Sequence, residues 1–205
     1  MRPPRALLPL VACAACASGP DPAPEPGVPS ALDPAPDTPL EPALGLPPDA
    51  HRMLADHAPT PFSAAQIEAA CAPGAFRTFT ITASGQTQRT RMVFGEPVDG
   101  KAVVANEVLD ATGAVAMRQE APPMGWDQLQ GHASFPEALV QLTVVTDQPT
   151  VAGVFDGWCY VVTAPNGAVT SFTFAHDLPG PPVLMTAWEG GFETQRMELV
   201  DYGPR

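Results

Sequence analysis

The sequence is poor in positive charge and in charge altogether. Its 205 residues include 22 acidic side chains against ten lysines and arginines, and charged residues make up 16% of the chain. Nucleic acids and anionic membrane surfaces are bound by clustered Lys and Arg, so a net charge of −12 argues against both as partners. Long apolar runs are missing too, because none reaches the ~18 residues that a membrane-spanning helix needs.

Motifs for catalysis and for metal binding are equally scarce. The chain has no Gly-x-Ser-x-Gly elbow, no Ser-x-x-Lys and no His-Glu-x-x-His. His51 and His57 are six residues apart, which is not the spacing of two ligands on one helix face. We therefore expect no catalytic residue, no metal and no cofactor. A hydrolase that uses Cys159 with His132 or the pair His176-Asp177 is the least favoured alternative.

The first recognisable feature of the sequence is an export signal at its start. Arg2 and Arg5 precede a short apolar stretch over residues 6–12. The next motif, Leu10-Val11-Ala12-Cys13, resembles the lipobox of bacterial lipoproteins, in which the cysteine is acylated and the chain is cut before it. The resemblance implies a signal peptide over residues 1–12 and lipidation of Cys13. The alternative is an ordinary secretory signal that is cut near Ala17.

The lipobox resemblance also implies a location. A lipoprotein is held at the membrane by two or three acyl chains, which anchor a protein stably. In this family an acidic residue after the lipidated cysteine favours the inner membrane. Ala14 is not acidic. We therefore expect a protein of the bacterial cell envelope that is lipid-anchored at the outer membrane.

Proline divides the rest of the chain into two parts. Sixteen of the 27 prolines lie within residues 1–61, and no basic residue occurs between Arg5 and Arg52. Proline removes backbone donors and disfavours helix, and few large apolar side chains remain there to be buried. We expect residues 13–61 to be a lipidated start followed by a disordered, acidic linker, and residues 62–205 to be a β-rich globular domain.

The domain has the pattern of an antiparallel meander. A capping box at Ser63–Gln66 predicts a short helix to Ala70, and residues 126–132 predict a second one. Runs of β-branched and aromatic residues between Gly-containing turns predict about nine strands with short connections. The fold class is therefore mainly β (α+β). The runs are 76–83, 89–94, 101–109, 114–119, 139–146, 150–155 leading through Asp156-Gly157 into 158–163, 169–175, 183–188 and 192–200.

One part of the domain, residues 149–183, has a distinctive order of motifs. Gly153-x-Phe155 opens a strand, Cys159-Tyr160-Val161-Val162 continues it, and Phe172-x-Phe174 precedes Leu178-Pro179-Gly180-Pro181-Pro182-Val183. This order resembles β-rich bacterial envelope lipoproteins of unassigned function. Some of them are similar in outline to the periplasmic lipoprotein-carrier fold, a half-open antiparallel barrel around short helices with an apolar cavity. The resemblance implies a half-open barrel or curved sheet and no functional residues.

The cysteines and tryptophans are the candidate site residues. Export would place Cys71 and Cys159 in an oxidising compartment, and we predict a disulfide between them. That bond requires Cys159 to face inward while Trp158 and Tyr160 face outward. The alternative is that both cysteines are small buried apolar residues. Any ligand pocket is expected to be lined by three tryptophans, which otherwise fill the core: Trp126, Trp158 and Trp188.

These observations favour a binding protein over an enzyme. The leading prediction is a non-catalytic, membrane-anchored envelope lipoprotein whose β domain binds an apolar ligand or a protein partner. The alternative is a structural or interaction lipoprotein without a ligand cavity. An apolar cavity open to solvent would favour the first, and a filled core would favour the second.

Overall fold

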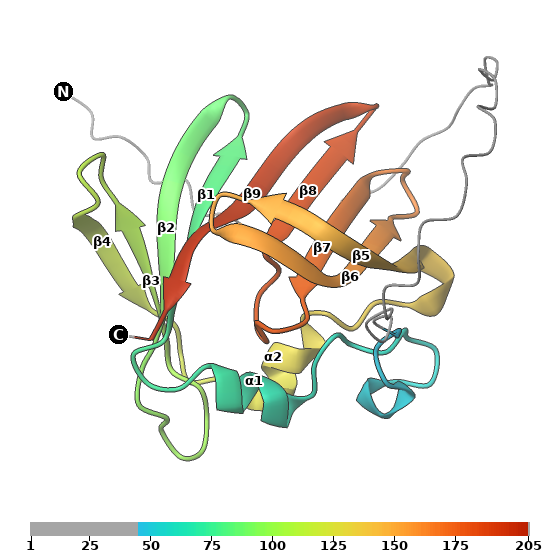
Figure 1. Ribbon diagram of the computed structural model, residues 1–205, viewed down its shortest axis with the longest axis horizontal. Helices are drawn as coiled ribbons and strands as arrows, with labels where there is room; N and C mark the ends of the chain where they lie inside the picture. Colours follow the sequence, from blue (N-terminus) through green and yellow to red (C-terminus); the bar gives the residue numbers. More distant parts are fainter. Residues whose placement is uncertain (1–44, 205) are drawn as a thin grey trace, which may run out of the picture.

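The computed structural model describes residues 45–204, and its main element is one nine-stranded antiparallel sheet (Figure 1). The order of strands is β4-β3-β2-β1-β9-β8-β7-β6-β5, so two meanders meet where the first strand pairs with the last. The predicted mainly β, antiparallel fold is confirmed. The strands are β1 (Phe76–Ala83), β2 (Gln86–Phe94), β3 (Val104–Leu109), β4 (Val115–Glu120), β5 (Val140–Thr150), β6 (Gly153–Thr163), β7 (Val169–Ala175), β8 (Leu184–Glu189) and β9 (Phe192–Gly203).

Two of the hairpin turns have the backbone conformation that their sequences favour. Ser84 and Gly85, between β1 and β2, have φ angles of 50° and 72°, and Gly190 and Gly191, between β8 and β9, have φ angles of 57° and 81°. A two-residue turn with positive φ at both positions matches the twist of the flanking strands. These turns keep neighbouring strands antiparallel with short connections.

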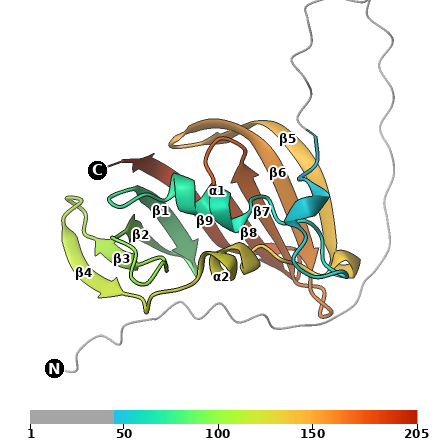
Figure 2. The same ribbon diagram turned by 90° about the horizontal axis from the view of Figure 1, so that it is seen from below.

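Two short helices lie against one face of the sheet, which is its concave face (Figure 2). Helix α1 (Ala64–Ala70) begins with the predicted capping box: the Gln66 backbone N–H donates to Ser63 Oγ, and the Ser63 backbone N–H donates to Gln66 Oε1. Helix α2 (Trp126–Gly131) lies next to α1 and belongs to the connection between β4 and β5. No helix within residues 45–204 is long and apolar enough to cross a membrane.

The hairpin of β5 and β6 differs from its prediction. Strand β5 continues to Thr150, the chain turns at Val151-Ala152, and β6 runs through Gly157 without a break. A Cβ atom at Gly157 would lie 1.8 Å from the carbonyl oxygen of Phe174 on β7. Glycine at this position therefore marks a close approach of two strands within a sheet, whereas the sequence was interpreted as a turn or bulge between two strands.

The interior consists of two groups of buried side chains. The first cluster lies under the helices and includes Phe62, Cys71, Trp158 and Tyr160. The second cluster lies inside the bend of the sheet, around Phe79, Val183 and Leu199. There the tip of the β5–β6 hairpin folds over, so that the Ala152 N–H donates to the Leu199 carbonyl at 3.2 Å. The sheet curls without closing, because β4 and β5 remain its two edges.

Residues 45–62, which we call the strap, pack against the first cluster. Ala58, Thr60 and Phe62 are buried, and the strap includes the 3-10 turn η1 (Asp49–His51). The predicted boundary at residue 61 was therefore too late, because the last part of the Pro-rich segment belongs to the folded domain. Residues 1–44, including Cys13, lie outside the described part of the chain.

Candidate functional site

The concave face, where a lipoprotein-carrier fold would hold an apolar ligand, is filled by this chain's own side chains. Phe62 from the strap packs edge-on against Trp158 and Phe174, with ring centroids 5.7 and 6.4 Å apart. Tyr160 is fully buried between Phe135 and Phe174. Edge-to-face packing of this kind adds to the stabilisation from burial. The first cluster is therefore a packed core.

The three tryptophans do not come together around a pocket. Trp126 and Trp158 are both buried in the first cluster, whereas the half-buried Trp188 belongs to neither cluster. The Trp158 indole N–H donates to the Gly45 carbonyl at 2.8 Å, so this side chain anchors the start of the strap. The Trp126 indole N–H is buried and has no hydrogen-bond partner within the described residues.

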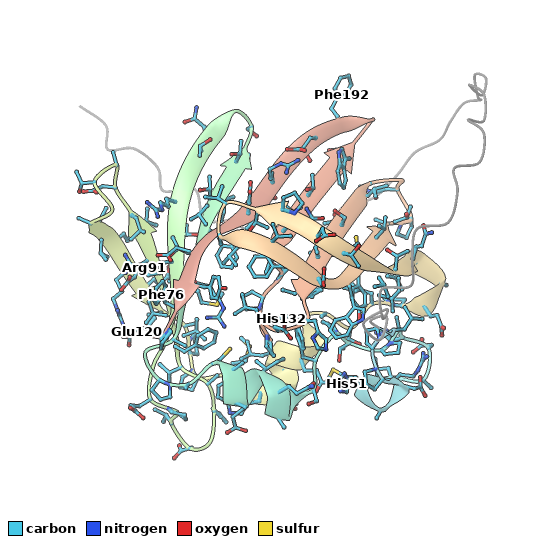
Figure 3. The ribbon with its side chains drawn as sticks, in the orientation of Figure 1. His51, Phe76, Arg91, Glu120, His132 and Phe192 are labelled. Carbon is cyan, nitrogen blue, oxygen red and sulfur yellow. The ribbon has the colours of Figure 1, made fainter. Side chains whose placement is uncertain are left out.

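Polar side chains from the sheet and from α2 fix the rest of the strap. The Tyr160 hydroxyl donates to the Pro59 carbonyl at 2.7 Å, and burial raises the pKa of this phenol. The Gln130 amide donates to Thr60 Oγ1 at 3.0 Å and to the His51 carbonyl at 3.2 Å. Buried polar groups are costly unless they are paired, so these bonds hold the strap in one position. Figure 3 shows His51 on the strap and His132 next to the end of α2.

The predicted Cys71–Cys159 disulfide is wrong, because both thiols are free. Trp158 and Tyr160 point into the first cluster with Cys71, and alternation along β6 turns Cys159 to the opposite face. The prediction assumed the reverse orientation. Burial raises the pKa of the Cys71 thiol to about 11, although the positive charge of Arg77 offsets part of the rise. Desolvation raises the pKa of Cys159 as well, so neither thiol is activated as a nucleophile.

Three of the four histidines have a polar partner within the described residues. His176 Nδ1 lies 2.8 Å from the carboxylate of its neighbour Asp177, at an exposed position. In the strap, His57 Nδ1 lies 2.9 Å from Ser134 Oγ. No group of three His, Cys, Asp or Glu side chains that could hold a metal ion occurs within residues 45–204.

The convex face carries a charged row that the sequence analysis missed. Arg91, Glu107 and Arg118 are in register on β2, β3 and β4, and Arg118 Nη1 donates to Glu107 Oε1 at 2.7 Å. The Arg91 Nε atom is 3.6 Å from Glu107 Oε2, and the Arg91 guanidinium lies over the Phe76 ring (Figure 3). The strand registers alone would have aligned these three residues. The row links three strands, and both of its arginines lie within ion-pair distance of Glu107.

Surface hollows occur at the other edge of the sheet, where β5 begins. One, of about 400 Å³, lies on the concave side and is lined by strap residues such as Leu46, Ala58 and Pro59 together with Val140 and Leu142. The other, of about 390 Å³, is lined by Ala138, Leu139, Gln141, Val161 and Thr163, among others. Both have mostly apolar walls. Because Gln141 and Leu142 are adjacent in β5, their side chains point to opposite faces. Val140 lines both hollows, so the two meet at the start of β5.

Comparison with known proteins adds no family. No protein family and no curated protein matches this chain in sequence. Among solved structures it is similar to a crystal structure of MucB, with 15% identity, a TM-score of 0.47, and coverage of 68% of this chain and 56% of that one. A MucA/MucB complex from Pseudomonas aeruginosa has 16% identity, a TM-score of 0.45 and coverage of 63% and 51%. MucB in complex with MucA(peri) has 14% identity, a TM-score of 0.46 and coverage of 68% and 53%. The chain therefore spans about half the length of the structures that it matches.

Proposed function

We propose that this chain is a lipid-anchored protein of the bacterial envelope whose β domain binds a protein partner and performs no chemistry. The observation that carries this proposal is the filled concave face: the strap, α1 and α2 occupy the space in which a carrier would hold an apolar ligand. The Cys71 and Cys159 thiols are not activated as nucleophiles, because burial raises the pKa of both. Binding at the surface is what this geometry supports.

The filled interior can be tested directly on the full chain purified from the envelope. Native mass spectrometry should give the mass of the acylated chain alone, with no apolar molecule bound. A dye that fluoresces in apolar cavities should give no more signal than it does with a packed globular protein of the same size. A lipid that co-purifies in stoichiometric amount would overturn the choice of a protein partner over an apolar ligand.

The anchor rests on the Leu10–Cys13 motif and needs its own experiment. Cys13→Ala should move the protein from the membrane fraction to the soluble fraction, whereas Cys16→Ala should leave it membrane-bound. Density-gradient separation of the two membranes should place the wild-type protein in the outer membrane, because Ala14 is not acidic. Unchanged membrane association of Cys13→Ala, with no acyl mass on the mature chain, would contradict the lipoprotein assignment.

A further inference from the structure

Strand β5 is an open edge of the sheet. It pairs with β6 on one side only, and no strand within residues 45–204 lies on its other side. An open edge leaves unpaired N–H and C=O groups, which can pair with another chain. The opposite edge, β4, differs because it carries charged side chains, with Arg118 Nη2 lying 3.2 Å from Glu120 Oε1, and charged residues on an edge discourage pairing.

The backbone bonds of β6 identify which residues of β5 face outward. The His176 N–H donates to the Asp156 carbonyl, which makes Asp156 and His176 a hydrogen-bonded pair. Such pairs alternate along an antiparallel ladder, so Trp158 and Tyr160 also bond to β7, whereas Gly157, Cys159 and Val161 bond to β5. The β5 partners of these last three residues are Val145, Thr143 and Gln141, which therefore use their backbone groups inside the sheet. Leu142 and Val144 then direct their N–H and C=O groups away from it. The Val140 N–H agrees with this pattern, because it donates to the Glu137 carbonyl instead of to β6.

The two hollows lie where an added strand would place its side chains. In a strand alongside β5, the residue opposite Leu142 points to the concave face, where Val140 and Leu142 line one hollow. The residue opposite Gln141 points to the convex face, where Gln141 and Val161 line the other. Strand addition combines main-chain bonds for affinity with pockets for alternate side chains for specificity. Both requirements meet at this edge.

We infer that an extended segment of the partner protein adds to β5 as a tenth strand and places two consecutive apolar side chains in the two hollows. This inference rests on the proposed function and names the site and the chemistry of the partner. The segment that docks is short. The β5–β6 register shifts between Val145 and Gln148, Asp147 has a φ of 53°, and Pro149 lacks an N–H, so regular pairing ends near Val145.

Charge gives the partner segment a second feature. Asp49 and Glu137 line the concave hollow, and a single cation, Arg52, serves both at 2.9 and 3.1 Å. One negative charge therefore remains at this rim. A basic residue beside the apolar pair would complement it. A second copy of this chain would bring an identical acidic rim, and the chain between Arg5 and residue 45 has no basic residue to offer.

The test uses the full chain, purified in detergent, and a set of eight-residue peptides. The parent peptide is Lys-Thr-Val-Leu-Leu-Val-Thr-Lys. The others replace its central pair with Val-Leu, Phe-Val or, as a control, Ser-Ser. Hydrogen exchange followed by NMR should show that peptides with an apolar pair protect the amides of Leu142 and Val144. The Ser-Ser peptide should bind at least tenfold more weakly.

Two matched pairs of variants locate the site. Val144→Pro removes an outward N–H without breaking a bond to β6 and should weaken binding at least tenfold, whereas Val144→Thr keeps the N–H and should bind like the wild type. Ala138→Trp fills the convex hollow and should weaken binding, whereas Ala116→Trp on β4 should not. Thermal unfolding checks that each variant is folded, and Ala138→Trp keeps the test valid if Val144→Pro is not.

Each of the other outcomes overturns the inference. It fails if no apolar peptide protects Leu142 and Val144, or if Val144→Pro and Ala138→Trp bind as the wild type does. It also fails if these amides are already protected and become exposed on dilution, which indicates a second copy, or on removal of residues 1–44, which indicates this chain's own N-terminal part. The proposed function has a separate failure, the co-purifying apolar ligand, which does not depend on the peptides.

Discussion

The two halves of the interior are closed in different ways. The first cluster, around Tyr160, is covered by chain from outside the sheet: the strap, α1 and α2. The second cluster, around Leu199, is covered by the sheet itself, because the β5–β6 hairpin bends over it and the Ala152 N–H reaches the Leu199 carbonyl. One curved sheet is thus covered by helices and the strap over one part of its concave face, and by its own bend over the other.

This difference shows which half of the domain depends on the strap, most of which the sequence analysis assigned to the linker. The second half is built from strands and the loops that join them, all within residues 76–203. The first half needs residues 45–62, which supply Phe62 to the core and backbone carbonyls to two buried donors. Removing the strap should therefore damage one half directly and the other only through the shared sheet.

Truncation should have the largest effect. A chain that begins at Ser63 loses Phe62 from the core and leaves the buried donors of Trp158 and Tyr160 unpaired, which together cost more than about 5 kcal/mol. That is comparable to the whole stability of a typical domain, ~5–15 kcal/mol. Urea titration followed by circular dichroism should show no cooperative unfolding, whereas a chain that begins at Gly45 should unfold like the full chain. Equal midpoints for the two truncated chains would show that the strap is not part of the core.

Single core substitutions should separate the two halves. Phe62→Ala and Leu199→Ala should each lower the free energy of unfolding by about 2–5 kcal/mol. Native-state hydrogen exchange should then accelerate in the strap and the helices for Phe62→Ala, and in β9 and the β5–β6 hairpin for Leu199→Ala. Phe192, 78% exposed at the tip of the β8–β9 hairpin (Figure 3), provides a control, since its replacement by Ala should change stability by no more than about 0.5 kcal/mol. Identical exchange patterns for both core variants would remove the distinction between the halves.

Alkaline pH should weaken the first half through Cys71. Its thiol pKa rises from 9.0 to about 11 on folding, so between these values the unfolded chain has lost a proton that the folded chain keeps. Stability from this group is complete below pH 9 and falls by roughly 2–3 kcal/mol as the pH rises to about 11. Urea titrations across this range should show that Cys71→Ala reduces the loss, whereas Cys159→Ala retains most of it. The same pH dependence in wild type and Cys71→Ala would show that the Cys71 thiol does not cause the loss of stability at alkaline pH.

The smallest of these effects concerns one hydrogen bond. Tyr160→Phe removes the donor to the Pro59 carbonyl while keeping the ring, and should cost about 1 kcal/mol. Tyr202→Phe is the matched control, because that side chain is 42% exposed, and its cost should stay within about 0.5 kcal/mol. Chemical denaturation of both variants measures the difference. A Tyr160→Phe variant as stable as Tyr202→Phe would mean that the strap contributes through apolar packing alone.

Local signals in the sequence were sufficient for most of the fold. The capping box at Ser63–Gln66, the glycine turns and the alternation in each strand act over a few residues, and the structure confirms them. Gly157 was misread because its reason lies on another strand, where the Phe174 carbonyl leaves no room for a Cβ. The end of the linker was misplaced because Pro59 is held by Tyr160, about a hundred residues away, and no local pattern shows such a contact.

The candidate sites were harder to predict, and the reason is orientation. Cys159 and Trp158 are neighbours, so a strand must send one inward and the other outward, and composition alone does not decide which. The presence of Trp158 and Tyr160 two positions apart in a buried strand was the signal that should have turned Cys159 outward. The hollows at β5 could not be predicted, because they depend on which strand ends the sheet and on where the strap lies beside it.

The way in which the strap is attached determines how the domain responds to a mechanical load. A pull on the chain from the N-terminal side reaches the bond between Gly45 and Trp158 first, then the contacts of His51 and Arg52, then Pro59 and finally Phe62. These contacts are met one after another, so they peel rather than shear together. Each break exposes only the next contact, whereas the β1–β9 ladder in the middle of the sheet yields only when many bonds break together. Tension would therefore uncover the aromatic face of the first cluster well before it unfolds the sheet.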